Sequence, residues 1–301
     1  MCNAENARKD SLTKPIDDLK KNILARFENT NPYFLHYIEE LVAKGVIEKR
    51  INYLCEEDKI KLPYVGSDKC IYLQSTFLCF LWIHCYYGLV VYEELVVKYF
   101  ENEQQGKNHV LNNELIERTI EFQKYAMSLF VYYSEWDLTV YPGPNTKDTS
   151  GKEYHILANQ LFLYAIDYIM CHEFAHLELG HFSSSKAAIE KEREADRRAF
   201  DLLLAGRDGK NDMSIEMGIL LGLSGLLFTG PSVSGGKSHP DKHERIKTYL
   251  ELLDPPCDSP IWSVVCYMIS VWDNKFSKNI DFPSTVADHK EMFYILYDRM
   301  C

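Results

Sequence analysis

Apolar residues recur at helical spacing along most of this chain, and the pattern predicts a mainly helical fold. The expected helices cover residues 33–49, 74–100, 112–134, 156–180, 186–205, 213–229, 240–253, 260–273 and 285–300. The clearest strand candidate is residues 136–141 (WDLTVY), which alternate apolar and polar side chains and stop at Pro-Gly-Pro. Residues 1–20 are a charged lead-in, in which Pro15 interrupts any early helix. The predicted fold class is therefore mainly α with a small β-sheet (α+β).

Two long apolar segments need to be distinguished from membrane spans. Residues 77–92 (FLCFLWIHCYYGLVVY) and residues 215–228 are both shorter than the roughly 20 residues with which a helix crosses a bilayer. The first segment carries His84, and the second carries Glu216. We therefore expect buried core helices and no transmembrane segment, and we leave contact with a membrane surface open.

Composition narrows the class of protein. With 301 residues, of which 46% are hydrophobic and 26% are charged, the chain is typical of globular proteins. Its formal charge of −11 argues against a general nucleic-acid binder, which needs clustered Lys and Arg. The polar N-terminus lacks the apolar core of a secretory signal, and the nine cysteines form no C-x-x-C pair. We expect a cytoplasmic protein with reduced, mostly buried thiols.

The candidate chemistry lies at residues 172–181 (HEFAHLELGH), at the end of the predicted helix 156–180. Side chains four apart share one face of a helix, so His172 and His176 can present two imidazoles to one metal ion. Glu173 leans towards the same open side, and Gly180 is a plausible C-cap. This His-Glu-x-x-His motif is typical of zinc metallopeptidases, in which Glu173 would be the general base.

A catalytic zinc needs a third protein ligand, with its fourth position left for water. The next predicted helix follows three serines, which are good N-caps, and it carries Glu192 and Asp196 four residues apart on one face. Glu190 and Glu194 are rivals for the ligand role. Glu190 has no aspartate four residues later, and Glu194 is rotated by about 200° from Glu192 around the helix.

The sequence His172-Glu173-x-x-His176 followed by Glu192-x-x-x-Asp196 resembles the signature of the gluzincins, zinc peptidases whose third ligand is a glutamate from a second helix. The resemblance implies a zincin-like metallopeptidase core with an active-site helix. It also implies one Zn²⁺ per chain, held by His172, His176 and Glu192. Asp196 would then hydrogen-bond His172 and fix its tautomer.

An edge strand beside such a site would bind an extended peptide through backbone hydrogen bonds. Residues 136–141 lie just upstream of the motif helix and are the candidate, with a short structural hairpin as the alternative. We expect residues 1–135 to form a mainly helical N-terminal region of unknown role. Residues 136–301 would form the zinc metallopeptidase core.

The last histidine of the motif is not expected to be a ligand. A metzincin would place its third histidine at position 182. This chain has Phe182 there, and His181 comes one residue too early. The motif instead resembles the gluzincin branch of the CAAX prenyl peptidase and the bacterial heat-shock peptidase, as does the segment 238–246 (SHPDKHERI). That resemblance implies that His239 stabilises the oxyanion and that Arg245 positions it or balances charge, whereas a surface helix cap is the alternative for His239.

The membrane spans of the best-known members of that branch are missing from this chain. Its length and the position of its motif resemble instead the phage-exclusion peptidases of the Lit type. The resemblance implies a phage-derived activator and cleavage of a translation factor such as elongation factor Tu.

These patterns predict a zinc metalloendopeptidase that hydrolyses peptide bonds in a cytoplasmic protein and binds its substrate in extended form. Two alternatives belong to other classes. One is a peptidase-like metal-binding regulator that acts mainly by binding a partner. The other is a structural domain whose paired histidines are buried and free of metal.

Overall fold

The computed structural model describes residues 14–98, 111–145 and 154–300. It is mainly helical with one three-stranded sheet, which confirms the predicted fold class. In chain order the described elements are η1 (Pro15–Leu19), α1 (Lys20–Glu28), α2 (Phe34–Ala43), β1 (Ile51–Leu54), β2 (Tyr64–Val65), β3 (Ile71–Gln74), α3 (Ser75–Tyr92), η2 (Glu93–Val97), α5 (Asn113–Ser128), α6 (Tyr154–Glu178), α7 (Ala188–Leu204), α8 (Asp212–Leu227), α9 (Lys242–Leu253), α10 (Pro260–Phe276) and α11 (His289–Arg299).

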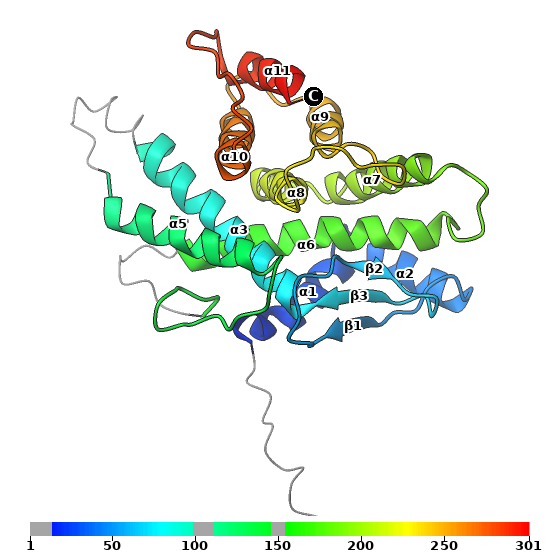
Figure 1. Cartoon of the computed structure of the whole chain (residues 1–301). Helices are drawn as coiled ribbons and strands as arrows, with labels where there is room; N and C mark the ends of the chain where they lie inside the picture. Colours follow the sequence, from blue (N-terminus) through cyan, green and yellow to red (C-terminus); the bar gives the residue numbers. More distant parts are fainter. Residues whose placement is uncertain (1–13, 99–110, 146–153, 301) are drawn as a thin grey trace, which may run out of the picture.

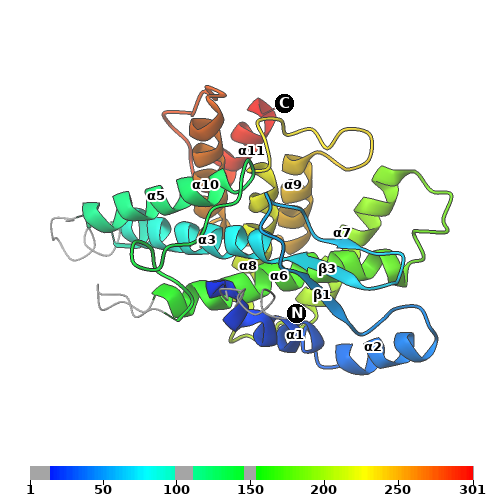
Figure 2. The same ribbon diagram turned by 60° about the horizontal axis from the view of Figure 1, so that its bottom comes forward.

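Helix α6, which carries the His-Glu-x-x-His motif, runs through the centre of the molecule (Figure 1). It packs against α8, α7, α3 and α1. In both views α1 and α2 lie on the opposite side of α6 from α9, α10 and α11 (Figures 1 and 2). Because α6 is surrounded in this way, residues 161–171 are apolar at every position except Asp167, and most of them are buried.

Close packing between α6 and α8 depends on a glycine. A Cβ atom at Gly218 of α8 would lie only 2.3 Å from the Cβ atom of Tyr164 on α6. Helix α8 therefore lies directly against the backbone of α6, and this contact helps to hold the motif helix in place.

The described part of the chain shares one hydrophobic core. Its buried residues come from α1 and α3 as well as from α6, α8 and α10, and α3 packs directly on α6. The division into regions 1–135 and 136–301 stays a prediction.

Both long apolar segments form core helices, as expected. Of the described helices, the continuous segment Ser75–Val97 is long and apolar enough to cross a membrane, and 89% of its apolar window is buried inside the fold. Helix α8 is likewise buried along most of its length. Their apolar character is thus accounted for by contacts within the protein.

The sheet has the order β1-β3-β2, with β1 parallel and β2 antiparallel to β3. It lies beside α6, and its edge strand β2 contacts that helix (Figure 1). The sequence patterns missed these strands because they are only two to four residues long and their connecting loops are charged and polar.

The strand predicted at 136–141 is wrong. These residues form a turn in which the backbone amide of Tyr141 donates to the carbonyl of Asp137 at 2.9 Å, and the amide of Thr139 donates to the Asp137 carboxylate at 2.8 Å. The ring of Trp136 packs 5.2 Å from the ring of Trp82, measured between ring centres. Trp136 and Tyr141 thus contact the core from a loop, whereas Leu138 and Val140 are exposed.

Two other predictions need correction. Pro15 begins a helix instead of interrupting one, because it occupies the first turn of η1, where Ile16 and Leu19 are buried. The helix predicted over 33–49 ends at Ala43, and the chain then leads into β1. Residues 1–13 of the predicted lead-in lie outside the described residues.

The cysteines of the described segments are all free thiols, in agreement with the expectation from their spacing. Five of these seven side chains are buried, and Cys55 and Cys257 are exposed. Burial raises the pKa of the Cys79 thiol to about 12, so this buried sulfur stays protonated and unreactive. Cys2 and Cys301 lie outside the described residues.

A buried histidine links α3 to α5 and α8 and predicts acid sensitivity of the fold. The Nε2 atom of His84 lies 2.9 Å from the Ser224 hydroxyl, and its Nδ1 atom lies 3.3 Å from the amide nitrogen of Gln123. Burial lowers the pKa of His84 from 6.5 to about 4. His84 of the unfolded chain therefore binds a proton more tightly than His84 of the folded chain. The folded state is not penalised above pH 6.5, where His84 is neutral in both states, and it loses stability as the pH falls from 6.5 towards 4.

We therefore expect the free energy of unfolding to fall between pH 6.5 and 4, and we expect His84→Gln to remove up to about 3 kcal/mol of that decrease. Urea unfolding followed by circular dichroism across this pH range would measure it. His36→Gln, at a histidine whose side chain is 79% exposed, is the matched control. The same pH dependence in His84→Gln and in the control would contradict the prediction.

Candidate metal centre

Helix α6 places the two motif histidines one turn apart, with their metal-facing nitrogens together. The Nε2 atoms of His172 and His176 are 3.2 Å apart. Both rings are largely withdrawn from solvent, with side-chain exposures of 9% and 14%. The helical spacing in the sequence thus produces the expected pair of converging imidazoles.

Glu192 of α7 completes a triangle with these two nitrogens. Its Oε2 atom lies 3.3 Å from His172 Nε2, and its Oε1 atom lies 3.4 Å from His176 Nε2. Ligands of a tetrahedral zinc ion with bonds of about 2.0–2.1 Å stand about 3.3 Å from one another. Two imidazole nitrogens and one carboxylate at these separations match such a donor set, and in the described residues these three side chains form a group that could hold a metal ion.

The rival glutamates lie elsewhere. Glu190 is exposed. Glu194 pairs with Lys186 and His181 and not with the Nε2 atoms of His172 and His176. The three serines before α7 do not cap it, because the helix begins at Ala188 after the N-cap residue Ala187.

Asp196 holds His172 from behind, at the side of the ring that faces away from the triangle. Its Oδ1 atom lies 2.9 Å from His172 Nδ1 and accepts a hydrogen bond from the Tyr168 hydroxyl at 2.8 Å. Arg245 of α9 forms a two-pronged ion pair with the same carboxylate, at 2.6 and 2.7 Å. Although burial alone would raise its pKa, the charge of Arg245 and the hydrogen bond to His172 hold the pKa of Asp196 far below its usual range. The ionised carboxylate therefore accepts a hydrogen bond from the Nδ1–H group of His172, and in this tautomer the lone pair of Nε2 is free to bind a metal.

His181 occupies the corresponding position behind His176. Its Nδ1 atom lies 2.9 Å from His176 Nδ1, and its Nε2 atom lies 3.2 Å from a Glu194 carboxylate oxygen. The side chain of His181 is only 3% exposed. As expected, His181 does not belong to the triangle, but it contacts one of its members.

Glu173 lies next to His172 on α6 and close to the edge strand β2. Burial raises the pKa of its carboxyl to about 7, partly opposed by the charge of His172 and by a backbone contact from Val65. Hydrogen bonds in an antiparallel pair alternate, and the Gly66 amide donates to the Cys70 carbonyl, so the backbone groups of Val65 point away from β3. The free edge of the sheet therefore faces Glu173.

His239 lies at the mouth of the triangle. Its Nε2 atom is 3.7 Å from Glu192 Oε2, its Nδ1 atom is 2.8 Å from the Ser238 hydroxyl, and its side chain is 53% exposed. The tertiary structure thus brings His239 and Arg245, from α9 and the segment before it, next to the residues of α6 and α7.

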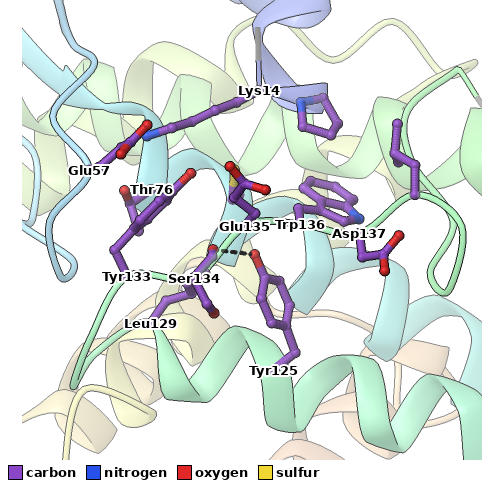
Figure 3. Close-up of a pocket in the computed structure, with 13 residues that line it drawn as sticks. Lys14, Glu57, Thr76, Tyr125, Leu129, Tyr133, Ser134, Glu135, Trp136 and Asp137 are labelled. Atoms are coloured by element: carbon purple, nitrogen blue, oxygen red, sulfur yellow. Dashed lines mark hydrogen bonds between the residues drawn. The ribbon is translucent and has the colours of Figure 1, made fainter. Parts of the chain in front are cut away.

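A cavity of about 650 Å³ lies between η1, α3, α5 and residues 133–138 (Figure 3). The hydroxyl of Tyr125 donates to the carbonyl of Ser134 in this cavity, and the ammonium group of Lys14 lies 4.6 Å from the centre of the Tyr133 ring. None of the residues that line it belongs to the metal triangle.

Two contacts were missed by the sequence analysis. The bond from Tyr168 to Asp196 could have been found, because Tyr168 lies four residues before His172 on the same helical face. The contact between His181 and His176 had no such signal, because it depends on a reversal of the chain after α6.

Comparison with known proteins gives one match. The family model described as Peptidase U49 matches residues 71–265, about two thirds of the chain, and this range contains α6, α7, His239 and Arg245 but not β2. Neither the curated proteins nor the solved structures contain a match to the chain.

The ion pair of Arg245 and Asp196 predicts a large loss of stability when its cation is removed. Arg245→Met leaves a buried carboxylate without its charge partner, and such a change lowers the free energy of unfolding by about 3–5 kcal/mol. Urea unfolding in the presence of a chelator would measure the loss without a contribution from metal. Arg193→Met removes the exposed pair with Glu244 and should cost less than about 1 kcal/mol; an equal loss in the two variants would refute the prediction.

Proposed function

Because the chain belongs to the peptidase U49 family, which includes the Lit-type peptidases, we propose that it is a zinc-dependent endopeptidase. The triangle formed by His172, His176 and Glu192 is the observation that carries this proposal. The two histidine Nε2 atoms are 3.2 Å apart, and they lie 3.3 and 3.4 Å from the two different oxygens of Glu192, which is close to the spacing of ligands around a tetrahedral zinc ion. In this proposal the enzyme is a gluzincin, with a glutamate from a second helix as third ligand.

When bound, zinc would polarise the scissile carbonyl and make a water molecule more acidic. The remaining roles belong to the protein. Glu173 borders the triangle and would take the proton from the attacking water, then pass it to the leaving amine. Its position against β2 shields it from solvent. His239 would donate a hydrogen bond to the developing oxyanion from the exposed side of Glu192.

The edge strand β2 is the surface to which an extended substrate would bind. Its outward backbone groups at Val65 face the side of α6 that carries Glu173. A peptide that pairs with this edge would run past the triangle and would be held mainly through its backbone. This role replaces the one that the sequence suggested for residues 136–141.

We further propose that the substrate is a cytoplasmic protein and that the enzyme acts in defence against phage. The support is the resemblance to Lit-type peptidases together with the family to which the chain belongs. In this proposal a phage-derived component activates cleavage of a translation factor such as elongation factor Tu.

Glu173→Gln separates catalysis from metal binding. The variant keeps all three ligands but loses the proton acceptor, so we expect bound zinc to remain and peptidase activity to fall by about 10²–10⁴-fold. Zinc content of freshly purified protein by elemental analysis and cleavage of the candidate translation factor would be compared with the wild type. Unchanged turnover in Glu173→Gln would exclude this mechanism.

Glu192→Ala removes a ligand and should lose zinc, whereas Glu190→Ala, one half-turn earlier on an exposed face of α7, should keep it. Elemental analysis of both variants tests the assignment. Full zinc occupancy in Glu192→Ala would show that the third ligand lies elsewhere.

The number of substrates distinguishes a dedicated defence peptidase from a general one. We expect cells that express the wild type with its activator to contain one dominant cleaved protein, identified by new peptide ends in proteomics, and cells that express Glu173→Gln to contain none. Cleavage of many proteins, or of casein, would instead indicate general turnover. Metal binding with no new peptide ends in either culture would indicate a regulator that acts by binding.

A further inference from the structure

We propose that His181 and Glu194 form a positioning arm that fixes His176 for metal binding, as Asp196 does for His172. The inference rests on the proposed function, because it concerns the same site. It assigns a role to a histidine that takes no part in the metal triangle, and to a glutamate that the sequence suggested only as a rival ligand.

The turn after α6 places His181 behind His176. Gly180 has a φ of +66°, a conformation that glycine adopts without steric cost, and the amide of His181 donates to the carbonyl of His176 at 3.0 Å. This hydrogen bond closes the end of the helix and reverses the chain. The ring of His181 consequently lies 5.0 Å from that of His176, measured between ring centres, on the side away from the triangle.

The hydrogen bonds assign the protons of both rings. His176 needs an unprotonated Nε2 atom to bind a metal, so its Nδ1 atom carries the proton and donates it to His181 Nδ1 at 2.9 Å. The Nδ1 atom of His181 is then the acceptor, and its Nε2–H group donates to the Glu194 carboxylate at 3.2 Å. One neutral tautomer of each histidine satisfies both contacts of His181, and in that tautomer His176 presents a lone pair to the metal.

The arm is anchored by two lysines. Lys186 pairs with the Glu194 carboxylate, and Lys191 donates to the backbone carbonyl of His181 at 2.7 Å. The site thus has two supports: His172 contacts its carboxylate directly, whereas His176 reaches a carboxylate through His181. Because His181 is 3% exposed, water cannot readily take its place.

Two substitutions of similar size separate this role from simple packing. The side chain of Asn places an oxygen close to the position of His Nδ1, so His181→Asn keeps an acceptor for His176, whereas His181→Leu fills the space without one. Loss of a partner behind a metal ligand weakens metal binding about 10- to 100-fold. We expect a loss of this size in His181→Leu, an affinity within a few-fold of wild type in His181→Asn, and a smaller loss in Glu194→Gln.

Zinc affinity would be measured by competition with a chromophoric chelator in the full-length protein, with Co²⁺ absorption spectra reporting the geometry of the site. Glu190→Gln, at an exposed glutamate of the same helix, is the matched control, and thermal unfolding of the metal-free variants identifies any that fail to fold. If His181 serves only to fill space, the His181→Leu variant will bind zinc as tightly as the His181→Asn variant or more tightly. That result overturns the inference while the proposed function stands. A wild-type protein that binds no zinc overturns both.

Discussion

The buried carboxylate of Asp196 is the interaction on which the site depends. It contacts Tyr168 and His172 of α6 and Arg245 of α9, and it belongs itself to α7, so one side chain fixes three helices relative to each other. A carboxylate so deeply buried would be costly on its own, and the two-pronged pair with Arg245 offsets that cost. The same contact that stabilises the packing also orients a metal ligand.

The motif helix is held from the other side by polar contacts with the N-terminal helices. Arg26 of α1 pairs with Asp167 at 3.0 Å, and Tyr37 of α2 contacts Glu178, which also pairs with Arg198 of α7. These contacts occur at both ends of the segment that carries the motif. Residues near the N-terminus thus support the geometry of a site to which they contribute no ligand.

The residues of the candidate metal group could be picked out from the sequence because the relations between them are local. The relation of His172, Glu173 and His176 follows from helical spacing, and Glu192 with Asp196 from the same rule on a second helix. The sequence predicted the edge strand poorly, because a strand of two residues has no pattern to detect. Residues 136–141 alternate in the same way as a strand, but they form a loop whose backbone is held by Asp137. Trp136 and Tyr141 contact the core, and Leu138 and Val140 are exposed.

By itself the sequence determined the helical class, the motif helix and the chemical types of the donors, because periodicity and residue identity act over one or two turns. Only the tertiary structure decided that Glu192 meets the two histidines and that β2 borders Glu173. It also decided that His181 returns to contact His176. These relations depend on how α7, the sheet and the turn at Gly180 pack around α6. Packing between segments that are distant in the sequence produces no regular spacing of residues, so it cannot be predicted from the sequence pattern.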